Sequence, residues 1–256
     1  MKSYFRPFRH AVRKRIRAYR GIYSQFDTIL LYLLKTNLQN TNTAPVIFDV
    51  GAHYGESIER FRNLFTESII HSFEADADNY KILKKNWGNK GDITLNNLGV
   101  SRAKGALLFH RNIKHNTSGF HAVNMESEWV KNRSARFDVS PDQFTEKSYE
   151  VPIIDLDSYV KEFEIPHIHL LKIDTQGHED EVLAGCEDTL KKGMIDVIET
   201  ELIVGNPYIK SLQFYDIEKT LIPLGFRFYG IDKGGDLLQK PSLGFNVIYV
   251  HERVLA

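Results

Sequence analysis

The sequence has a single cysteine, Cys186, so no disulfide can form within the chain. Such a composition is typical of proteins from a reducing compartment. Long apolar runs are also absent, because the run Ile29–Leu34 is far shorter than the roughly 20 apolar residues that a membrane-spanning helix needs. This run lies too far from the N-terminus, and lacks the small-residue cleavage site, for a signal peptide. We therefore expect a cytoplasmic protein.

Net charge is lacking as well, because 33 basic and 33 acidic residues cancel. The overall charge thus gives no reason to expect a nucleic-acid partner. The basic residues are unevenly distributed, however: residues 1–20 contain eight Lys or Arg and no acidic residue, and their apolar positions 5, 8, 12, 16 and 19 recur at helical spacing. This basic arm predicts either a peripheral contact with an anionic membrane or a protein partner, or an amphipathic helix packed on its own domain.

From Val46 onward, short apolar runs alternate with segments of helical periodicity. This alternation is typical of a parallel sheet that is covered by helices on both faces. The last two runs, 226–231 and 245–250, are separated by only 13 residues without helical periodicity, which predicts an antiparallel pair. The expected fold is therefore α/β, with a Rossmann-like, mostly parallel sheet, an antiparallel C-terminal strand and helices on both faces. The expected strands cover residues 46–50, 69–73, 93–95, 167–173 and 195–198, and the expected helices cover residues 56–65, 77–87, 178–191 and 212–222.

The predicted organisation is an N-terminal extension over residues 1–43, with a second apolar helix at 24–35, followed by one α/β domain over residues 44–256. Residues 101–152 form an irregular insertion that is mostly polar and contains one expected strand at 106–110. Insertions at the carboxyl edge of a sheet often cover a substrate, although a disordered surface loop is the alternative.

A glycine-containing turn follows the first apolar run. Gly51 allows a tight turn and the close approach of a ligand to the backbone, and Gly55 lets a helix begin close to the strand. Glu74 ends the second run, 19 residues after Gly55, where an acidic side chain can bind the two hydroxyls of an adenosine ribose. We expect the adenine after the third run. The predicted cofactor-binding residues are Asp49, Gly51, His53, Gly55, Glu74, Asn97, Ser101 and Asp174.

Four segments in a fixed order carry a resemblance to a known family: Val46–Gly55, Ser72–Asp76, Val151–Asp157 and Leu171–Gly185. On these segments the chain resembles the FkbM family of S-adenosylmethionine-dependent methyltransferases from about residue 46 to residue 250. The resemblance implies a class I methyltransferase fold, S-adenosyl-L-methionine as the cofactor, and O-methylation of a hydroxyl on a sugar, glycan or secondary metabolite. The sequence departs from the family at His53, where Asn is usual, at Gln176, where an acid is usual, and at Gly99, where Ala is typical.

The methyl acceptor would need a general base, because the pKa of an alcohol lies far above neutrality. Asp174 ends the fourth apolar run, and His178 and Glu179 begin the following helix. We expect these three residues to be catalytic, with His178 or Asp174 taking the acceptor proton. Helix capping by Asp174 and a favourable first-turn position for Glu179 are the purely structural alternatives. We predict no metal; a Mg²⁺ site built from Asp174, Glu199 or Glu201 and a histidine is the less favoured option.

Two other function classes explain parts of the sequence. A nicotinamide-dependent oxidoreductase would account for Gly51 and Glu74, but not for the missing G-x-G-x-x-G fingerprint or the terminal strand pair. A non-catalytic Rossmann-like module would act through its basic N-terminal arm. A nucleic-acid methyltransferase is disfavoured, because the chain has no Asn/Asp-Pro-Pro-Tyr motif and no basic segment outside the arm.

Overall fold

A computed structural model describes residues 24–38, 43–203, 205–232 and 244–255 of the chain. The basic arm at residues 1–20 lies outside these described residues, so its membrane or protein contact stays a prediction. Within the part of the chain that the structure describes, no helix is both long and apolar enough to cross a membrane. The cytoplasmic location and the domain boundary near residue 43 also stay predictions.

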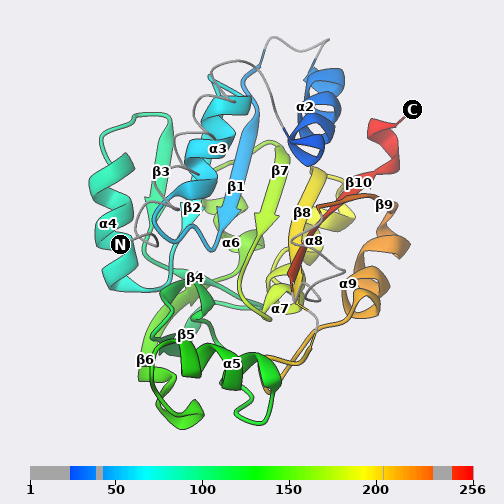
Figure 1. The fold of residues 1–256 in the computed structure, drawn as a ribbon. Helices are drawn as coiled ribbons and strands as arrows, with labels where there is room; N and C mark the ends of the chain where they lie inside the picture. The colour runs from blue at the N-terminus through cyan, green and yellow to red at the C-terminus, as the bar shows by residue number, and fades with distance from the viewer. Residues whose placement is uncertain (1–23, 39–42, 204, 233–243, 256) are drawn as a thin grey trace.

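The main sheet has seven strands in the order β3-β2-β1-β7-β8-β10-β9 (Figure 1). The first five strands in this order are parallel to their neighbours, and β10 runs antiparallel to both β8 and β9. This arrangement confirms the predicted α/β fold with its antiparallel C-terminal strand. The strands are β1 (Val46–Val50), β2 (Ile69–Phe73), β3 (Ile93–Asn96), β7 (Ile168–Ile173), β8 (Ile195–Ile203), β9 (Phe226–Ile231) and β10 (Gly244–His251).

Helices cover both faces of this sheet, because its central strands are apolar on both sides. One face packs against α2 (Gln25–Leu38), α3 (Glu56–Leu64) and α4 (Ala77–Trp87). The opposite face packs against α6 (Leu156–Glu162), α7 (Glu179–Ala184), α8 (Glu187–Lys191) and α9 (Phe214–Leu221). The described residues also form four short 3₁₀ turns: η1 (His115–Thr117), η2 (Pro141–Gln143), η3 (Ile222–Leu224) and η4 (Glu252–Val254).

The helix that was predicted over residues 178–191 is broken in two at Gly185 and Cys186, so this prediction was wrong in its continuity. A Cβ on Gly185 would lie 2.0 Å from the carbonyl oxygen of Ser101. The two backbone segments are therefore too close for any residue with a side chain at position 185. The carbonyl of Gly185 accepts a hydrogen bond from Asp157 N–H instead of continuing the helical ladder. This close crossing is a tertiary contact, which helical periodicity does not report.

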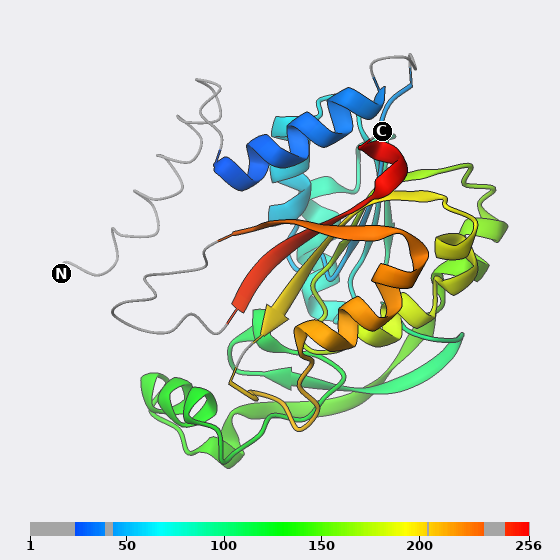
Figure 2. The same ribbon diagram turned by 90° about the vertical axis from the view of Figure 1, so that its right-hand side faces the viewer.

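The insertion forms a second sheet, of three strands in the order β4-β6-β5, together with α5 (Glu128–Arg136). Its strands are β4 (Gly99–Val100), β5 (Gly105–Asn112) and β6 (Thr145–Ile154). The expected strand at 106–110 is therefore present but longer, and its antiparallel partner β6 was missed. Figure 2 shows this small sheet across the carboxyl end of the main sheet. The insertion is thus an ordered wall at the edge where ligands bind in open α/β sheets.

Candidate active site

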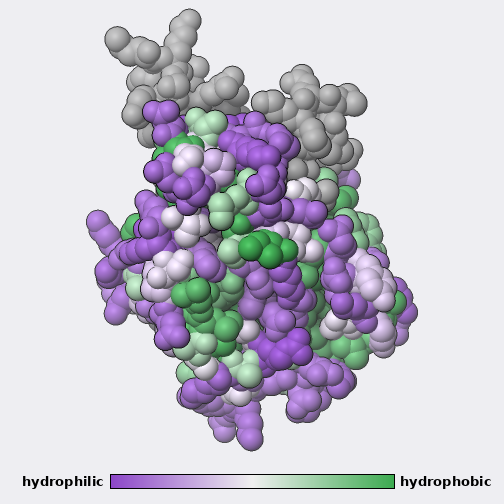
Figure 3. Space-filling model, turned by 90° about the horizontal axis from the view of Figure 1, so that it is seen from below, coloured by the Kyte–Doolittle hydropathy of each residue, from purple (hydrophilic) through white to green (hydrophobic). Residues whose placement is uncertain are grey.

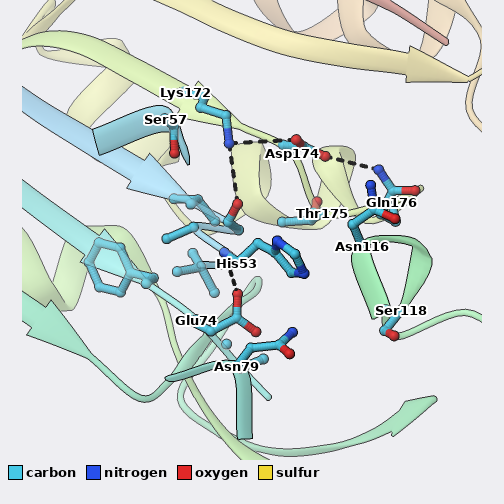
Figure 4. Close-up of a pocket in the computed structure, with 18 of the residues that line it drawn as sticks. His53, Ser57, Glu74, Asn79, Asn116, Ser118, Lys172, Asp174, Thr175 and Gln176 are labelled. Carbon is cyan, nitrogen blue, oxygen red and sulfur yellow. Dashed lines mark hydrogen bonds and ion pairs between the residues drawn. The ribbon is translucent and has the colours of Figure 1, made fainter. Parts of the chain in front are cut away.

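The carboxyl ends of β1, β2 and β7 meet at one edge of the main sheet and open onto a cavity of about 400 Å³ (Figure 4). Four predicted site residues line this cavity: Gly51, His53, Glu74 and Asp174. The insertion supplies the opposite wall. The predicted residues that do not line the cavity are Asp49, Gly55, Asn97, Ser101, His178 and Glu179.

Gly51 makes the turn that brings β1 close to the end of β7. Its φ of +81° is in the left-handed region, and a Cβ at this position would lie 1.9 Å from the carbonyl oxygen of Asp174. The N–H groups of Gly51 and Ala52 both donate to the carbonyl oxygen of Phe73, at 3.0 Å. The turn therefore closes against two neighbouring strands, and only glycine fits at its first position.

A buried charge pair supports the floor of the cavity. Lys172 Nζ lies 3.1 Å from Asp49 Oδ1, donates to the carbonyl oxygen of Gly51 at 3.2 Å and lies 3.6 Å from Asp174 Oδ2. Burial lowers the pKa of Lys172, but the charges of Asp49 and Asp174 outweigh that cost and raise it, so the ammonium stays protonated. Asp49 thus lies beneath the cavity and does not line it. Its carboxylate forms the ion pair with Lys172 and accepts a hydrogen bond from Ser57 Oγ at 2.5 Å.

One end of the cavity has unused hydrogen-bonding capacity around Glu74. Its carboxylate accepts from the N–H groups of His53 at 2.7 Å and Asp76 at 2.9 Å, and burial raises its pKa to about 7. His53 Nε2 and Asn79 Oδ1 are buried here and have no hydrogen-bond partner among the described residues. These atoms, with the second lone pairs of Glu74, suit a polyhydroxylated heterocycle such as adenosine. The chain therefore fits the nucleoside part of the expected cofactor.

The other end of the cavity is acidic. Gln176 Nε2 donates to Asp174 Oδ1 at 2.9 Å and to the carboxylate of Glu201 on β8. Burial, followed by the nearby charges of Asp174 and Glu179, raises the pKa of Glu201 well above its ordinary value. Burial and the neighbouring negative charge of Asp174 therefore favour the protonated form of Glu201.

Each carboxylate considered for a metal has at least one protein partner, although Glu199 Oε2 is buried without a hydrogen-bond partner among the described residues. Glu199 Oε1 forms an ion pair with Arg60 Nη1 at 2.6 Å, and Glu201 is held by Gln176. Among the described residues, three ligand-type side chains converge only at His167, His169 and Asp196, near the amino-terminal ends of β7 and β8. His169 Nδ1 accepts the N–H of Val46, so in the neutral ring the other nitrogen carries the proton and is a poor ligand.

His178 and Glu179 lie behind the cavity wall, which corrects the predicted placement at its surface. His178 Nε2 is 2.9 Å from Ser101 Oγ, and burial lowers the pKa of its ring to about 4. The Glu179 carboxylate accepts the N–H groups of Thr175 at 2.9 Å and Gly177 at 3.0 Å. The Glu179 side chain therefore shapes the loop that carries Asp174 and Gln176, whereas the His178 side chain joins this turn to Ser101.

Asn97 and Ser101 also differ from the predicted adenine contacts. Asn97 Nδ2 donates to the carbonyl oxygen of Glu74 at 2.8 Å, so this amide holds the loop after β2. Ser101 is buried and paired with His178, whereas Leu98, Gly99 and Val100 line the cavity between them. Both side chains are used within the protein, so neither takes the predicted place against an adenine.

The insertion contributes cavity residues that the sequence reasoning did not select. They are Phe109, His115, Asn116, Ser118, Gly119 and Phe120. The hydroxyl of Tyr54, after the β1 turn, lies 3.2 Å from His115 Nδ1 and links the two walls. His121 lies outside the cavity wall, and its Nε2 lies 3.2 Å from His178 Nδ1. No spacing signal marked these positions.

Comparison with known proteins agrees with the geometry. A family model described as the methyltransferase FkbM domain matches residues 49–228. The 2-O-methyltransferase NoeI of Sinorhizobium fredii (strain NBRC 101917 / NGR234) is 28% identical over 153 residues, which cover 58% of this chain and 60% of that protein. The chain thus spans about three-fifths of the length of this curated relative.

Solved structures with a similar fold include two methyltransferases. An rRNA methylase from Streptococcus thermophilus is 10% identical with a TM-score of 0.47, over 90% of this chain and 98% of that one. The magnesium protoporphyrin IX methyltransferase ChlM from Synechocystis PCC 6803 is 9% identical with a TM-score of 0.45, over 88% and 77% of the two chains. Since the family model covers well over half of the sequence, the chain belongs to the FkbM methyltransferase family.

Proposed function

We propose that the chain is an S-adenosylmethionine-dependent methyltransferase that methylates a hydroxyl oxygen of a small molecule or glycan. The observation that carries the proposal is that a single cavity joins Glu74, at the end of β2, to the Asp174–Glu201 pair, at the ends of β7 and β8. Family membership and the relative described as a 2-O-methyltransferase support the same chemistry. They give no corresponding support to an oxidoreductase or a non-catalytic module.

Glu74, His53 and Asn79 would hold the nucleoside of the cofactor, and the Gly51 turn above Lys172 would hold its amino-acid part. When bound, the cofactor supplies a methyl group on a positively charged sulfur, already activated for transfer. The chain therefore has to position the acceptor in line with that group, which can lower the barrier by several kcal/mol, and to take up one proton.

We assign proton uptake to Asp174. Gln176 Nε2 fixes its Oδ1, while its Oδ2 lies 3.6 Å from Lys172 Nζ, so the carboxylate is held by two donors at the cavity wall. The proton released by the acceptor hydroxyl can then be shared with Glu201, whose pKa is raised by burial and by Asp174. In this proposal Glu179 is a positioning residue, since it acts through the 175–177 loop, and His178 supports the segment at Ser101 instead of touching the substrate.

The acceptor would lie against the insertion. Asn116, Ser118 and Asn246 offer polar groups at the cavity wall, and Phe120 offers an aromatic surface. A mixture of hydrogen-bonding side chains and one aromatic ring suits a sugar, which has hydroxyls on its rim and apolar C–H groups on its faces. Transfer of a labelled methyl group from S-adenosylmethionine to a panel of sugars and oligosaccharides tests this assignment. Methylation of nitrogen or carbon instead of oxygen would contradict it.

The elevated pKa of Glu74 predicts that cofactor affinity depends on pH. Burial raises this pKa to about 7, so the carboxyl is mostly protonated at pH 6 and mostly ionised at pH 8. Because the ionised form is the better acceptor for ribose hydroxyls, affinity for S-adenosylhomocysteine should rise about tenfold between pH 6 and pH 8. Calorimetric titration at several pH values measures this change. In the Glu74→Gln variant affinity should be lower and independent of pH; an equal slope in both proteins would assign the titration to another group.

A further inference from the structure

Three basic side chains of the insertion, which do not themselves line the cavity, have no carboxylate partner among the described residues. They are Lys114, Arg133 and Arg136, which we name the insertion cation cluster. Among the described residues none of the three forms an ion pair or donates a side-chain hydrogen bond. Neighbouring cations behave differently: Lys131 on the same helix lies 3.6 Å from Glu128, and Lys210 lies 2.6 Å from Asp180.

The backbone places Lys114 next to the cavity wall and places the two arginines on one side of α5. Lys114 directly precedes η1, and its carbonyl oxygen accepts from Thr117 N–H at 2.9 Å and Thr117 Oγ1 at 2.7 Å, which shapes the turn that carries His115 and Asn116 into the cavity wall. Arg133 and Arg136 are three residues apart on α5, so they share one face of the helix.

The helix itself is anchored to the cavity wall through aromatic residues. The guanidinium of Arg133 lies 4.2 Å from the ring centre of Trp129, and that ring lies 6.1 Å from the ring of Tyr208. The hydroxyl of Tyr208 in turn donates to Gln176 Oε1 at 2.8 Å. A chain of contacts therefore connects the cation cluster to the residue that holds Asp174.

The electrostatics of the cluster are unfavourable without a ligand. Lys114 and Arg133 are half-buried, and burial followed by repulsion from the neighbouring guanidinium groups lowers the pKa of Lys114. Burial and Arg136 likewise lower the pKa of Arg133. The charge of Glu201 acts in the opposite direction on both, as expected for groups near the acceptor end, but Glu201 is bound to Gln176 and not to them. Like charges that are partly withdrawn from water favour an external anion.

We propose that the insertion cation cluster is an anion-binding subsite, and that the methyl acceptor is therefore a hydroxyl compound carrying a phosphate, sulfate or carboxylate group. The inference rests on the proposed methyltransferase function and adds a substrate class to it. The acceptor hydroxyl lies at Asp174, while the anionic group of the same molecule extends past His115 and Asn116 to the cluster. The face of the molecule seen from below is mostly hydrophilic, with smaller hydrophobic patches (Figure 3).

The test measures anion binding separately from cofactor binding. Inorganic phosphate is titrated into the full chain saturated with S-adenosylhomocysteine, at constant ionic strength, and the fluorescence of Trp129 is followed in a Trp87→Phe background. We expect saturable binding. The Lys114→Gln/Arg133→Gln/Arg136→Gln variant should weaken it about tenfold or more, because it removes all three charge-assisted contacts.

A charge-matched control distinguishes a site from general electrostatic attraction. The Lys84→Gln/Lys85→Gln/Lys90→Gln variant removes the same charge from exposed positions in and after α4 and should bind phosphate as the parent does. Arg136→Gln alone, at an exposed position, keeps the contact of Arg133 with Trp129 and should weaken binding to a smaller extent. Titration of glucose 6-phosphate, glucuronate and glucose then identifies the anion, with the neutral sugar expected to bind most weakly.

Two results would overturn the subsite. If the parent binds S-adenosylhomocysteine but shows no saturable phosphate binding, the cluster only balances the cavity carboxylates, and the proposed function is unaffected. If both triple variants lose phosphate binding equally, the effect belongs to net charge. Loss of cofactor binding with phosphate binding intact would instead refute the methyltransferase proposal and leave the anion site in place.

Discussion

Replacing Asp174 with asparagine is expected to lower kcat by about 10²–10⁴-fold, the usual contribution of a positioned general base. The substitution keeps the side chain's shape, and the new amide could still accept from Gln176 Nε2 through its carbonyl oxygen. It removes the negative charge that faces Lys172 and the capacity to take a proton. Affinity for S-adenosylhomocysteine should remain close to that of the parent, because Asp174 lies at the opposite end of the cavity from Glu74. Methyl transfer from labelled cofactor measures kcat, and calorimetry measures the affinity.

Asp188→Asn is the matched control, since Asp188 is exposed on α8 and lies outside the cavity wall. Its kcat should equal that of the parent. Glu201→Gln should cause a smaller loss than Asp174→Asn, because Glu201 acts through its neighbour. Full activity in Asp174→Asn would remove this residue from the chemistry and would leave the cavity without an identified base.

Replacing Gly51 with alanine should have the largest effect on stability. The backbone φ of +81° disfavours any side chain, and the new Cβ would lie 1.9 Å from the carbonyl oxygen of Asp174. Left-handed strain costs about 1–3 kcal/mol and forced overpacking about 1–3 kcal/mol, so the free energy of unfolding should fall by about 2–6 kcal/mol. Urea denaturation followed by circular dichroism measures this loss. Because β1 and β7 must separate, cofactor binding should be lost as well.

Gly91→Ala is the control for the loss of glycine flexibility. Gly91 is exposed, does not have a left-handed φ, and a Cβ there would meet no atom within 4 Å. Its free energy of unfolding should change little or increase slightly, because alanine restricts the unfolded chain. Equal stability of Gly51→Ala and the parent would show that the turn can open, contrary to the close packing described above.

The sequence predicted the main sheet well because its strands are buried on both faces. Continuous apolar runs such as those of β1 and β7 have few alternatives, and the short segment between the last two runs favoured an antiparallel pair. β6 was missed because Thr145–Glu150 is polar and largely exposed, so it has no apolar run. The break at Gly185 depends on the distant carbonyl of Ser101, which local periodicity cannot report.

The candidate site was predictable where parallel strands end. Gly51, Glu74 and Asp174 follow three neighbouring strands, and the carboxyl ends of parallel strands share one edge. The direction of the side chains in the turn after β7 was not predictable. His178 and Glu179 follow Asp174 closely in the sequence, but their side chains lie behind the cavity wall. This arrangement follows from the left-handed backbone of Gln176 and Gly177, at φ +58° and +99°. The contribution of Asn116 and Phe120 depends on how the insertion folds over the sheet.

Calorimetric titration of the full chain with S-adenosylhomocysteine tests the central claim most directly, namely that the turn at Gly51 and the carboxylate of Glu74 bind an adenosyl amino acid. The account predicts saturable binding of one molecule per chain, with a matching increase in Tm, and the loss of both in Glu74→Ala. A parent protein that folds but releases no heat and shows no change in Tm with S-adenosylmethionine or S-adenosylhomocysteine would contradict it.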